Sequence, residues 1–241
     1  MITLNQVRKY YDQKEGFVLA LSCDSLTLGD GEVIGILGAN GAGKTTLLKA
    51  IMGFLRFEGE ILIDGAPVNR QYQDISFITE EGSFLPFLTP LEYGEFQADF
   101  WPRFDMARYR RLLEFFGLAG ENRPIAAFSN GQQAKIEVAA GFSRGARYIL
   151  MDEPFLGKDV FTRRDFLKMM AASLHGEETI LLCTHQIEEI EHFLDRAVVL
   201  SQGKVAADLT IDELRESGKA LLGLMQEISG YDGERYKEFL S

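Results

Sequence analysis

The chain has 241 residues, of which 46% are hydrophobic and 25% are charged, and its formal net charge at pH 7 is -11. This length suits one folded domain with a sizeable core, and the composition excludes a disordered or low-complexity chain. Proteins that bind nucleic acid usually carry a basic face, so the acidic charge argues against nucleic acid as a partner.

The sequence also bears on the cellular compartment. It contains no apolar run of about 18–20 residues, the length that crosses a bilayer, and its first residues lack the apolar segment of a secretory signal. Cys23 and Cys183 are too few and too far apart for a disulfide framework or a zinc motif, and we expect both to be buried. These features predict a soluble cytoplasmic protein.

The first third of the chain is rich in short strand patterns. Strands are predicted over residues 2–7, 18–28, 32–37, 58–64 and 75–78, with a polar turn at 12–16 and a hairpin turn at Asp64-Gly65.

A glycine-rich stretch follows the apolar strand 32–37 and precedes a helix predicted over 47–52. It reads Gly-Ala-Asn-Gly-Ala-Gly-Lys-Thr-Thr and matches G-x-x-x-x-G-K-S/T. Backbone N–H groups in such a loop hold phosphate oxygens, the lysine adds charge at the β/γ-phosphates, and the next hydroxyl ligates Mg²⁺. A glycine-rich turn with an incidental lysine, or a dinucleotide loop with glycines in G-x-G-x-x-G order, fits less well. The stretch predicts a nucleoside triphosphate and Mg²⁺ site formed by Gly38, Asn40, Gly41, Gly43, Lys44, Thr45 and Thr46.

Residues 82–144 are the aromatic part of the chain, and their apolar spacing predicts an inserted helical lobe. Its aromatic side chains could form a small core of their own or a surface for docking another protein, since aromatic residues are enriched at interfaces. The arginines between Asp99 and Arg111 are most simply the solvated face of a helix.

The second half of the chain alternates strands with helices. Strands are predicted over 147–151, 179–183, 197–200 and 204–207, helices over 159–174 and 186–194, and a helical tail from residue 211. Buried apolar strands between helices indicate an α/β sheet that is partly parallel.

Two carboxylates end the strand 147–151. In a P-loop fold an acidic residue at this position holds the metal through its water shell, which makes Asp152 the metal-site candidate. Glu153 is the candidate to orient or deprotonate the attacking water, although Asp-Glu could also simply cap a helix. His185 follows the strand 179–183, and from the residues alone it could be a functional group or a plain strand-end residue.

The order of these motifs resembles that of the nucleotide-binding subunit of an ABC transporter. The resemblance covers nearly the whole chain, through 38–45, Phe128-Ser129-Asn130-Gly131-Gln132, Asp152-Glu153-Pro154, Asp159 and His185. It implies an α/β P-loop NTPase fold of the ABC type, with a mixed sheet, an N-terminal antiparallel β region and an inserted α-helical subdomain. The single domain 1–241 would comprise a RecA-like core (1–81 and 145–241), a helical signature subdomain (82–144) and a short helical tail from about 210.

The resemblance also implies roles for individual residues. Ser129, Gly131 and Gln132 would belong to a signature motif that reaches the γ-phosphate held by an opposite subunit, and Asp159 would couple the two sites of the dimer. Tyr11 would stack on adenine, with Tyr10 and Phe17 as alternatives. The remaining matches are Glu153 as the catalytic carboxylate, His185 as the γ-phosphate contact, and Glu80 at the position of a metal-contacting glutamine.

Two departures from the family pattern stand out. Phe128 and Asn130 replace the usual leucine and first glycine of the signature, from which we expect a weakened or retuned γ-phosphate contact. Glu80 in place of glutamine adds negative charge beside a triphosphate, which bears on the gating of hydrolysis.

The resemblance implies an ATPase that powers a separately encoded membrane permease, together with a second nucleotide-binding subunit that is either the same chain or a paralogue. The protein would lie at the inner face of the cell membrane through the permease. Phe84 to Thr89 resembles export-type members, so export is expected. A soluble ABC-type scaffold or regulator, or a catalytically weak partner in a heterodimer, are the alternatives.

Overall fold

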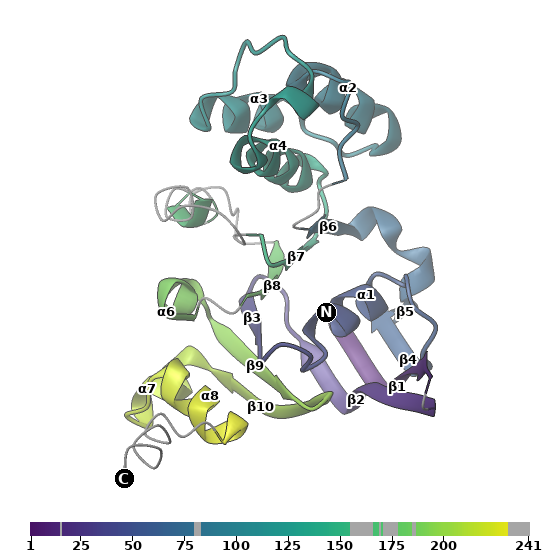
Figure 1. The fold of residues 1–241 in the computed structure, drawn as a ribbon, viewed down its shortest axis with the longest axis vertical. Helices are drawn as coiled ribbons and strands as arrows, with labels where there is room; N and C mark the ends of the chain where they lie inside the picture. The colour runs from purple at the N-terminus through teal and green to yellow at the C-terminus, as the bar shows by residue number, and fades with distance from the viewer. Residues whose placement is uncertain are drawn as a thin grey trace.

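The computed structural model describes residues 1–14, 16–79, 83–154, 166–168, 170, 178–184 and 187–230. Its described strands form one ten-stranded sheet in the order β5-β4-β1-β2-β10-β9-β3-β8-β7-β6. A lobe of helices stands at one end of the molecule, beyond β6 and β7, and the C-terminal helices lie at the other end (Figure 1). The predicted mixed α/β fold is confirmed.

The half of the sheet that ends at β6 consists of parallel strands, as their continuous apolar sequences predict. These are β3 (Val33–Leu37), β6 (Ile75–Thr79), β7 (Tyr148–Asp152) and β8 (Thr179–Cys183), with β9 (Arg196–Ser201) parallel to β3. Alternate side chains enter different clusters. Val33 belongs to one hydrophobic cluster, whereas Ile34 and Ile36 belong to the other. Both faces of these strands are therefore buried.

The antiparallel region is made by β1 (Ile2–Gln13), β2 (Gly16–Leu28), β4 (Glu58–Ile63) and β5 (Ala66–Pro67). The first two strands are longer than predicted, because β1 pairs with β2 as far as Gln13 opposite Gly16. Backbone pairing does not require apolar side chains, so the polar residues after Val7 continue the strand. The register shifts between Lys9 and Tyr10.

The lobe contains α2 (Pro90–Phe100), α3 (Met106–Phe115) and α4 (Asn130–Ser143), within the predicted bounds 82–144. Its aromatic residues divide into two groups. Tyr93 and Tyr109 are fully buried, whereas Phe87 and Phe100 are exposed. The lobe therefore has a small core of its own and also presents aromatic surface.

The prediction of a solvated arginine face on α3 is partly wrong. Arg108 pairs with Glu178, 2.9 Å away, and both side chains are only 11% exposed. Arg110 and Arg111 are exposed as predicted. The difference arises because Glu178, just before β8, is distant in sequence and could not be assigned as a partner.

The remaining described elements complete the core. Helix α1 (Lys44–Ile51) follows β3, α6 (Ile187–Ile190) precedes β9, and β10 (Lys204–Thr210) leads into α7 (Ile211–Glu216) and α8 (Leu221–Ser229). Both cysteines are buried and unpaired, as predicted. Within the described part of the chain, the helices are too short or too polar to cross a bilayer.

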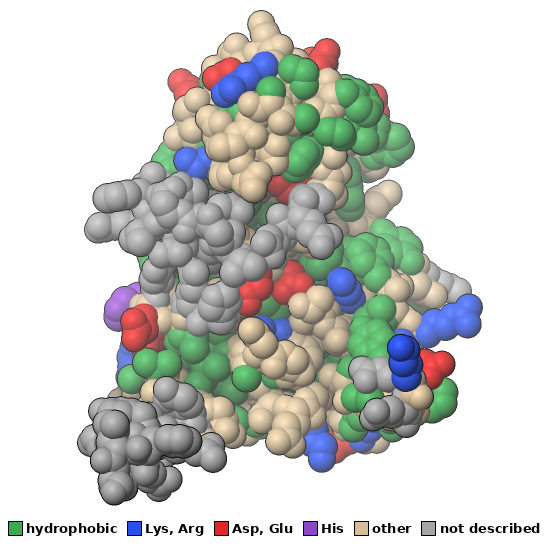
Figure 2. Space-filling view, in the orientation of Figure 1, with side chains coloured by type: hydrophobic (Ala, Val, Ile, Leu, Met, Phe, Trp, Pro, Cys, Tyr) green, Lys and Arg blue, Asp and Glu red, His purple; other side chains and the backbone are tan. Residues whose placement is uncertain are grey.

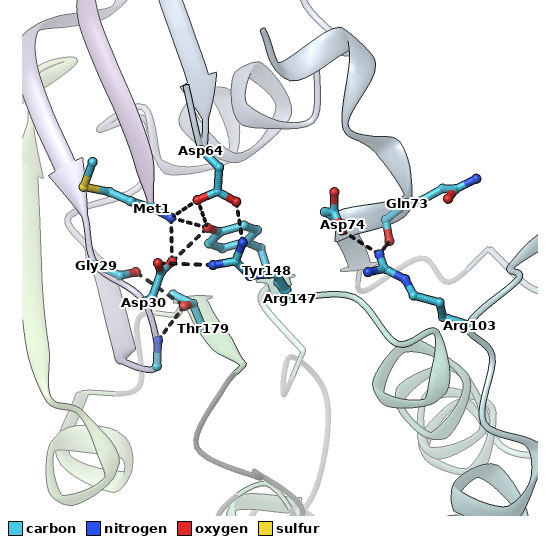
Figure 3. Close-up of polar contacts among 11 residues, drawn as sticks. Met1, Gly29, Asp30, Asp64, Gln73, Asp74, Arg103, Arg147, Tyr148 and Thr179 are labelled. Carbon is cyan, nitrogen blue, oxygen red and sulfur yellow. Dashed lines mark hydrogen bonds and ion pairs between the residues drawn. The ribbon is translucent and has the colours of Figure 1, made fainter. Parts of the chain in front are cut away.

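A polar cluster ties together the chain segments at the N-terminal ends of the parallel strands (Figure 3). The Tyr148 hydroxyl donates to Asp30 at 2.8 Å, and Arg147 pairs with both Asp30 and Asp64. The Met1 amino group lies 2.6 Å from each of the two carboxylates. This cluster is at the edge of the sheet opposite to the glycine-rich loop, which follows the C-terminal end of β3.

Candidate functional site

The glycine-rich loop connects β3 to α1 as predicted. The Lys44 side chain is 7% exposed, and its Nζ donates to the carbonyl oxygens of Gly38 at 2.8 Å and Ala39 at 3.2 Å. The ammonium group is thus held against the start of the loop, while Asn40, Gly41 and Thr45 are exposed and Thr46 is half-buried. A fixed cation beside the backbone of a glycine-rich loop and a helix N-terminus suits a phosphate chain.

Two glycines are required by the shape of this loop. Gly43, at the N-cap of α1, has φ +104°, and a Cβ added there would lie 2.6 Å from the backbone oxygen of Ala20. Gly38 has φ +148°, and a Cβ there would meet the backbone oxygen of Leu200. Only glycine adopts these conformations without strain and allows such close backbone contacts. The spacing of the sequence motif therefore has a direct steric cause.

Asp152 lies at the C-terminal end of β7 and faces Thr45 across the end of the sheet. Burial raises the pKa of its carboxyl group, a hydrogen bond from Thr45 opposes this, and the negative charge of Glu153 adds to it. Among the described residues, its buried Oδ1 has no hydrogen-bond partner. An unpaired carboxylate oxygen beside a threonine hydroxyl fits a hard cation such as Mg²⁺, which prefers oxygen ligands.

Glu153 has an unusual backbone conformation. Its φ is +48°, in the left-handed region, and its N–H donates to Cys183 O at the end of β8 at 2.9 Å. For a residue other than glycine this conformation carries a strain of about 1–3 kcal/mol. Strain of this kind is concentrated at functional sites, which agrees with the expected role of Glu153.

The strand ends align these groups. Thr79 is paired with Asp152, and Asp152 with Cys183. The ends of β6, β7 and β8 are therefore side by side. This register could not be read from the sequence, in which the three strands are separated by long segments.

The signature segment begins helix α4 in the lobe. Ser129 is the N-cap residue, and its Oγ accepts from the Gln132 N–H at 3.4 Å, while Gln132 Oε1 accepts from the Ser129 N–H at 3.2 Å. Asn130 is the first helical residue and Gly131 the second, so the replacement of glycine by Asn130 requires no left-handed backbone. The predicted helix N-terminus, an anion-binding feature, is present.

The phosphate loop and the signature lie in different parts of the molecule. The loop belongs to the core beside α1, whereas α4 is in the helical lobe (Figure 1). This separation agrees with a signature that serves the nucleotide of another subunit.

The adenine-stacking residue remains a prediction. Tyr11 is 38% exposed, and Lys9 Nζ lies 5.0 Å from the centroid of its ring. Its two alternatives, Tyr10 and Phe17, line a cavity of about 490 Å³ together with Arg8, Arg56, Phe57 and Glu58. Three further predicted residues, Glu80, Asp159 and His185, lie outside the described residues.

One buried polar network was not predicted from the sequence. Glu137 of α4 and Arg144, the C-cap residue of α4, are both buried, and Arg144 donates a hydrogen bond to Phe77 O of β6. A signal was present, because Glu137 interrupts an apolar run from Ile136 to Ala140.

A family model described as ABC transporter matches residues 21–156, more than half of the chain. The chain belongs to the ABC transporter family. The ATP-binding protein YtrB of Bacillus subtilis is 29% identical over 221 residues, which cover 90% of this chain and 74% of YtrB. The aliphatic sulfonates import protein SsuB 1 of Xanthomonas axonopodis pv. citri is 36% identical over 184 residues, 73% of this chain and 72% of the relative.

Further ABC proteins are similar to this chain in sequence or in structure. The lipopolysaccharide export protein LptB of Haemophilus influenzae is 28% identical over 226 residues, 89% of this chain and 92% of LptB. A solved dimeric cassette bound to ADP and Pi has a TM-score of 0.78 at 26% identity, covering 88% of this chain and 99% of that one. A solved ATP-binding subunit of an ABC transporter has a TM-score of 0.80 at 26% identity over both whole chains.

The chain is the ATP-binding subunit of an ABC transporter and an ATPase, so both predictions are confirmed. The relatives include import proteins as well as an export protein, so family membership leaves the direction of transport open.

Proposed function

We propose that this ABC subunit hydrolyses ATP at two composite sites of a dimer and thereby drives export through a separately encoded membrane permease. One observation supports the composite site above the others. The chain carries a phosphate loop with a held lysine, an unpaired Asp152 oxygen and a capped signature helix, yet the loop and the signature lie in different lobes.

The proposed chemistry assigns each group a task. Lys44 and the loop N–H groups bind the β- and γ-phosphates, and Thr45 and Asp152 hold Mg²⁺, which neutralises charge on these phosphates when bound. Glu153 orients the attacking water and accepts its proton. Ser129 and Gly131 of the second subunit complete the site, so a single subunit binds ATP but hydrolyses it poorly. The expected contributions of Glu80, Asp159 and His185 are part of this proposal.

The permease partner is supported by exposed aromatic surface. Phe54 is 59% exposed and packs edge-to-face on Phe77 with centroids 6.1 Å apart, and on α2 Leu91 and Phe100 are 41% and 66% exposed. Hydrophobic side chains gather on the side of the lobe that carries α2 and on the core below it (Figure 2). Apolar aromatic surface of this kind marks protein interfaces. The subunit would thus be held at the inner face of the membrane.

The direction of transport is proposed from sequence alone. The segment Phe84 to Thr89 follows the Glu80 position and has the pattern of export-type subunits.

The enzyme proposal is tested by Mg²⁺-dependent ATP turnover and by dimer formation. Glu153→Gln should abolish turnover and accumulate an ATP-bound dimer, whereas Lys44→Ala should lose ATP binding and dimerisation together. Absence of turnover in the wild-type protein, or a Glu153→Gln protein that stays monomeric with ATP, would refute it.

The partner proposal is tested by recovery from membranes. Wild-type subunit should co-purify with an integral membrane protein, and substitution of Leu91 and Phe100 by serine should reduce that recovery. Phe115→Ser is the matched control, because Phe115 is 53% exposed in the same lobe but belongs to α3 rather than to α2. Equal losses for patch and control would contradict the assigned surface, and transport assays on the recovered complex would decide the direction.

A further inference from the structure

A buried polar network joins the signature helix α4 to its neighbours. Glu137, in the middle of α4, is only 1% exposed. The Tyr93 hydroxyl donates to its Oε2 at 2.9 Å, and the Ser83 hydroxyl donates to its Oε1 at 2.5 Å. Arg144 Nη2 lies 3.7 Å from the same Oε1. A carboxylate is rarely buried to this degree unless it is paired and hydrogen-bonded.

Arg144 carries the network into the core. Its Nε donates to Gln97 Oε1 of α2 at 3.0 Å, and its Nη1 donates to Ser76 Oγ at 3.3 Å and Phe77 O at 3.2 Å. Ser76 in turn donates to Gly141 O of α4 at 2.9 Å. The C-terminal half of α4 is therefore bonded directly to β6, an edge strand of the sheet in the described part of the chain.

Strand β6 connects this contact to the nucleotide site. It pairs in parallel with β7, so that Ile78 is opposite Met151 and Thr79 is opposite Asp152. The N-terminal end of α4 is capped by Ser129 of the signature. Helix α4 thus connects the buried ion pair to the signature, and the β6–β7 strand pair connects it to Asp152.

Packing at the same contact leaves little freedom. A Cβ added to Gly141 would lie 2.5 Å from the Ile78 side chain, so helix and strand are in close contact. An apolar interface alone would tolerate small slides, whereas hydrogen bonds weaken steeply away from their preferred angles. A buried ion pair often stabilises a fold no more than apolar residues would. Its presence here therefore suits a role in fixing the position of α4 on β6.

We propose that Glu137 and Arg144 are positioning residues of the ATPase, which fix the signature helix on the strand pair that ends in Asp152. The inference rests on the proposed function of the site. Neither residue is assigned a contact with ATP; they act through α4 and β6. Misplacement of reacting groups by about 1 Å can cost about 100-fold in rate.

The test separates the effect of these residues on turnover from their effect on the stability of the fold. Glu137→Gln and Arg144→Gln each leave a buried partner without its charge and should lower the melting temperature. The double variant removes both charges and should recover most of that loss, because the uncompensated charge is gone. In all three proteins we expect turnover to fall by about 10- to 100-fold, with ATP affinity of the single subunit unchanged.

A second readout reports the signature directly. In a Glu153→Gln background, ATP-driven dimerisation depends on the signature and should be weakened by the double Glu137→Gln, Arg144→Gln change even though stability has recovered. Ser83→Ala is the milder variant, because Ser83 is an exposed residue that loses one hydrogen bond to Glu137. It should lower turnover while changing the melting temperature less than the single charge variants do, and it keeps the test valid if those variants do not fold.

The matched control is a buried ion pair that joins the lobe to the core at a different place. Arg108 and Glu178 are similarly buried but belong to neither α4 nor β6, so their double replacement by glutamine should leave ATP-driven dimerisation intact. Recovery of turnover along with stability in the Glu137 and Arg144 double variant would overturn the inference, as would an equal loss in the control. A wild-type protein without Mg²⁺-dependent turnover would instead overturn the proposed function itself.

Discussion

Replacing Asp152 with asparagine should stabilise the nucleotide-free protein while removing most of its ATPase activity. The wild-type carboxylate is half-buried, beside the negative charge of Glu153, and its Oδ1 has no hydrogen-bond partner among the described residues. Asparagine removes the charge and keeps an oxygen that can accept from Thr45. Asparagine still leaves one buried polar atom without a partner, but burying a charge costs more than burying a neutral amide. For this half-buried side chain we expect a gain of about 1 kcal/mol, at the lower end of the range for unsatisfied buried groups.

A gain of about 1 kcal/mol corresponds to a rise of about 2–4 °C in melting temperature for a domain of this size. The gain should depend on pH. Burial raises the pKa of Asp152 in the folded protein, so the wild-type protein is destabilised above the unfolded pKa and recovers as pH falls through the folded pKa. The difference between the two proteins should therefore be largest at neutral pH and should shrink on acidification.

The assay is thermal unfolding of both nucleotide-free proteins from neutral to acidic pH, together with Mg²⁺-dependent ATP turnover. Loss of a group that orients the metal should reduce turnover by about 10- to 100-fold. Asp30→Asn is a control for which the opposite change in stability is expected. Burial would raise the pKa of Asp30, but hydrogen bonds from the Met1 ammonium and Tyr148 outweigh it and lower the pKa. That variant should be less stable at neutral pH. A less stable Asp152→Asn protein, or one with full Mg²⁺-dependent turnover, would refute the reasoning.

Three further predictions concern the phosphate loop, the helical lobe and the residue that stacks on adenine. Gly43→Ala should abolish ATP binding measured with a fluorescent analogue, because its Cβ would meet a β2 carbonyl, and retained affinity would contradict the steric argument. Gly94→Ala should lower stability by about 1–3 kcal/mol in denaturant titrations, because the added methyl would overlap the Tyr109 ring; an unchanged midpoint would show that the ring can move. Tyr11→Ala should weaken ATP binding more than Phe17→Ala does, and the reverse order would move the adenine to the cavity lined by Phe17.

Local chemistry made most of the nucleotide site predictable. The segment 38–46 combines glycine spacing, lysine and threonine, and each has a local steric or electrostatic reason that requires no knowledge of the fold. Likewise, the apolar run before Asp152 predicts a buried strand ending in a carboxylate. Ser129 followed by Gln132 is a capping pair, which the structure shows as such.

Partners distant in sequence could not be predicted in the same way. The Arg108 contact with Glu178 and the Glu137 network join segments whose proximity depends on how helices pack on the sheet. The continuation of β1 beyond Val7 also depends on a partner strand, since backbone hydrogen bonds hold residues whose side chains are exposed.

The sequence by itself determined that this chain binds a nucleoside triphosphate, because a phosphate loop is a local structure whose residues are consecutive. Only the tertiary structure decided which strand ends meet, that Asp152 Oδ1 is buried beside Thr45, and that the signature helix is bonded to β6 rather than to the phosphate loop. The physical reason is that burial, strand register and helix packing depend on the whole chain. They determine the pKa of a carboxylate and the orientation of a helix, and neither is encoded in neighbouring residues.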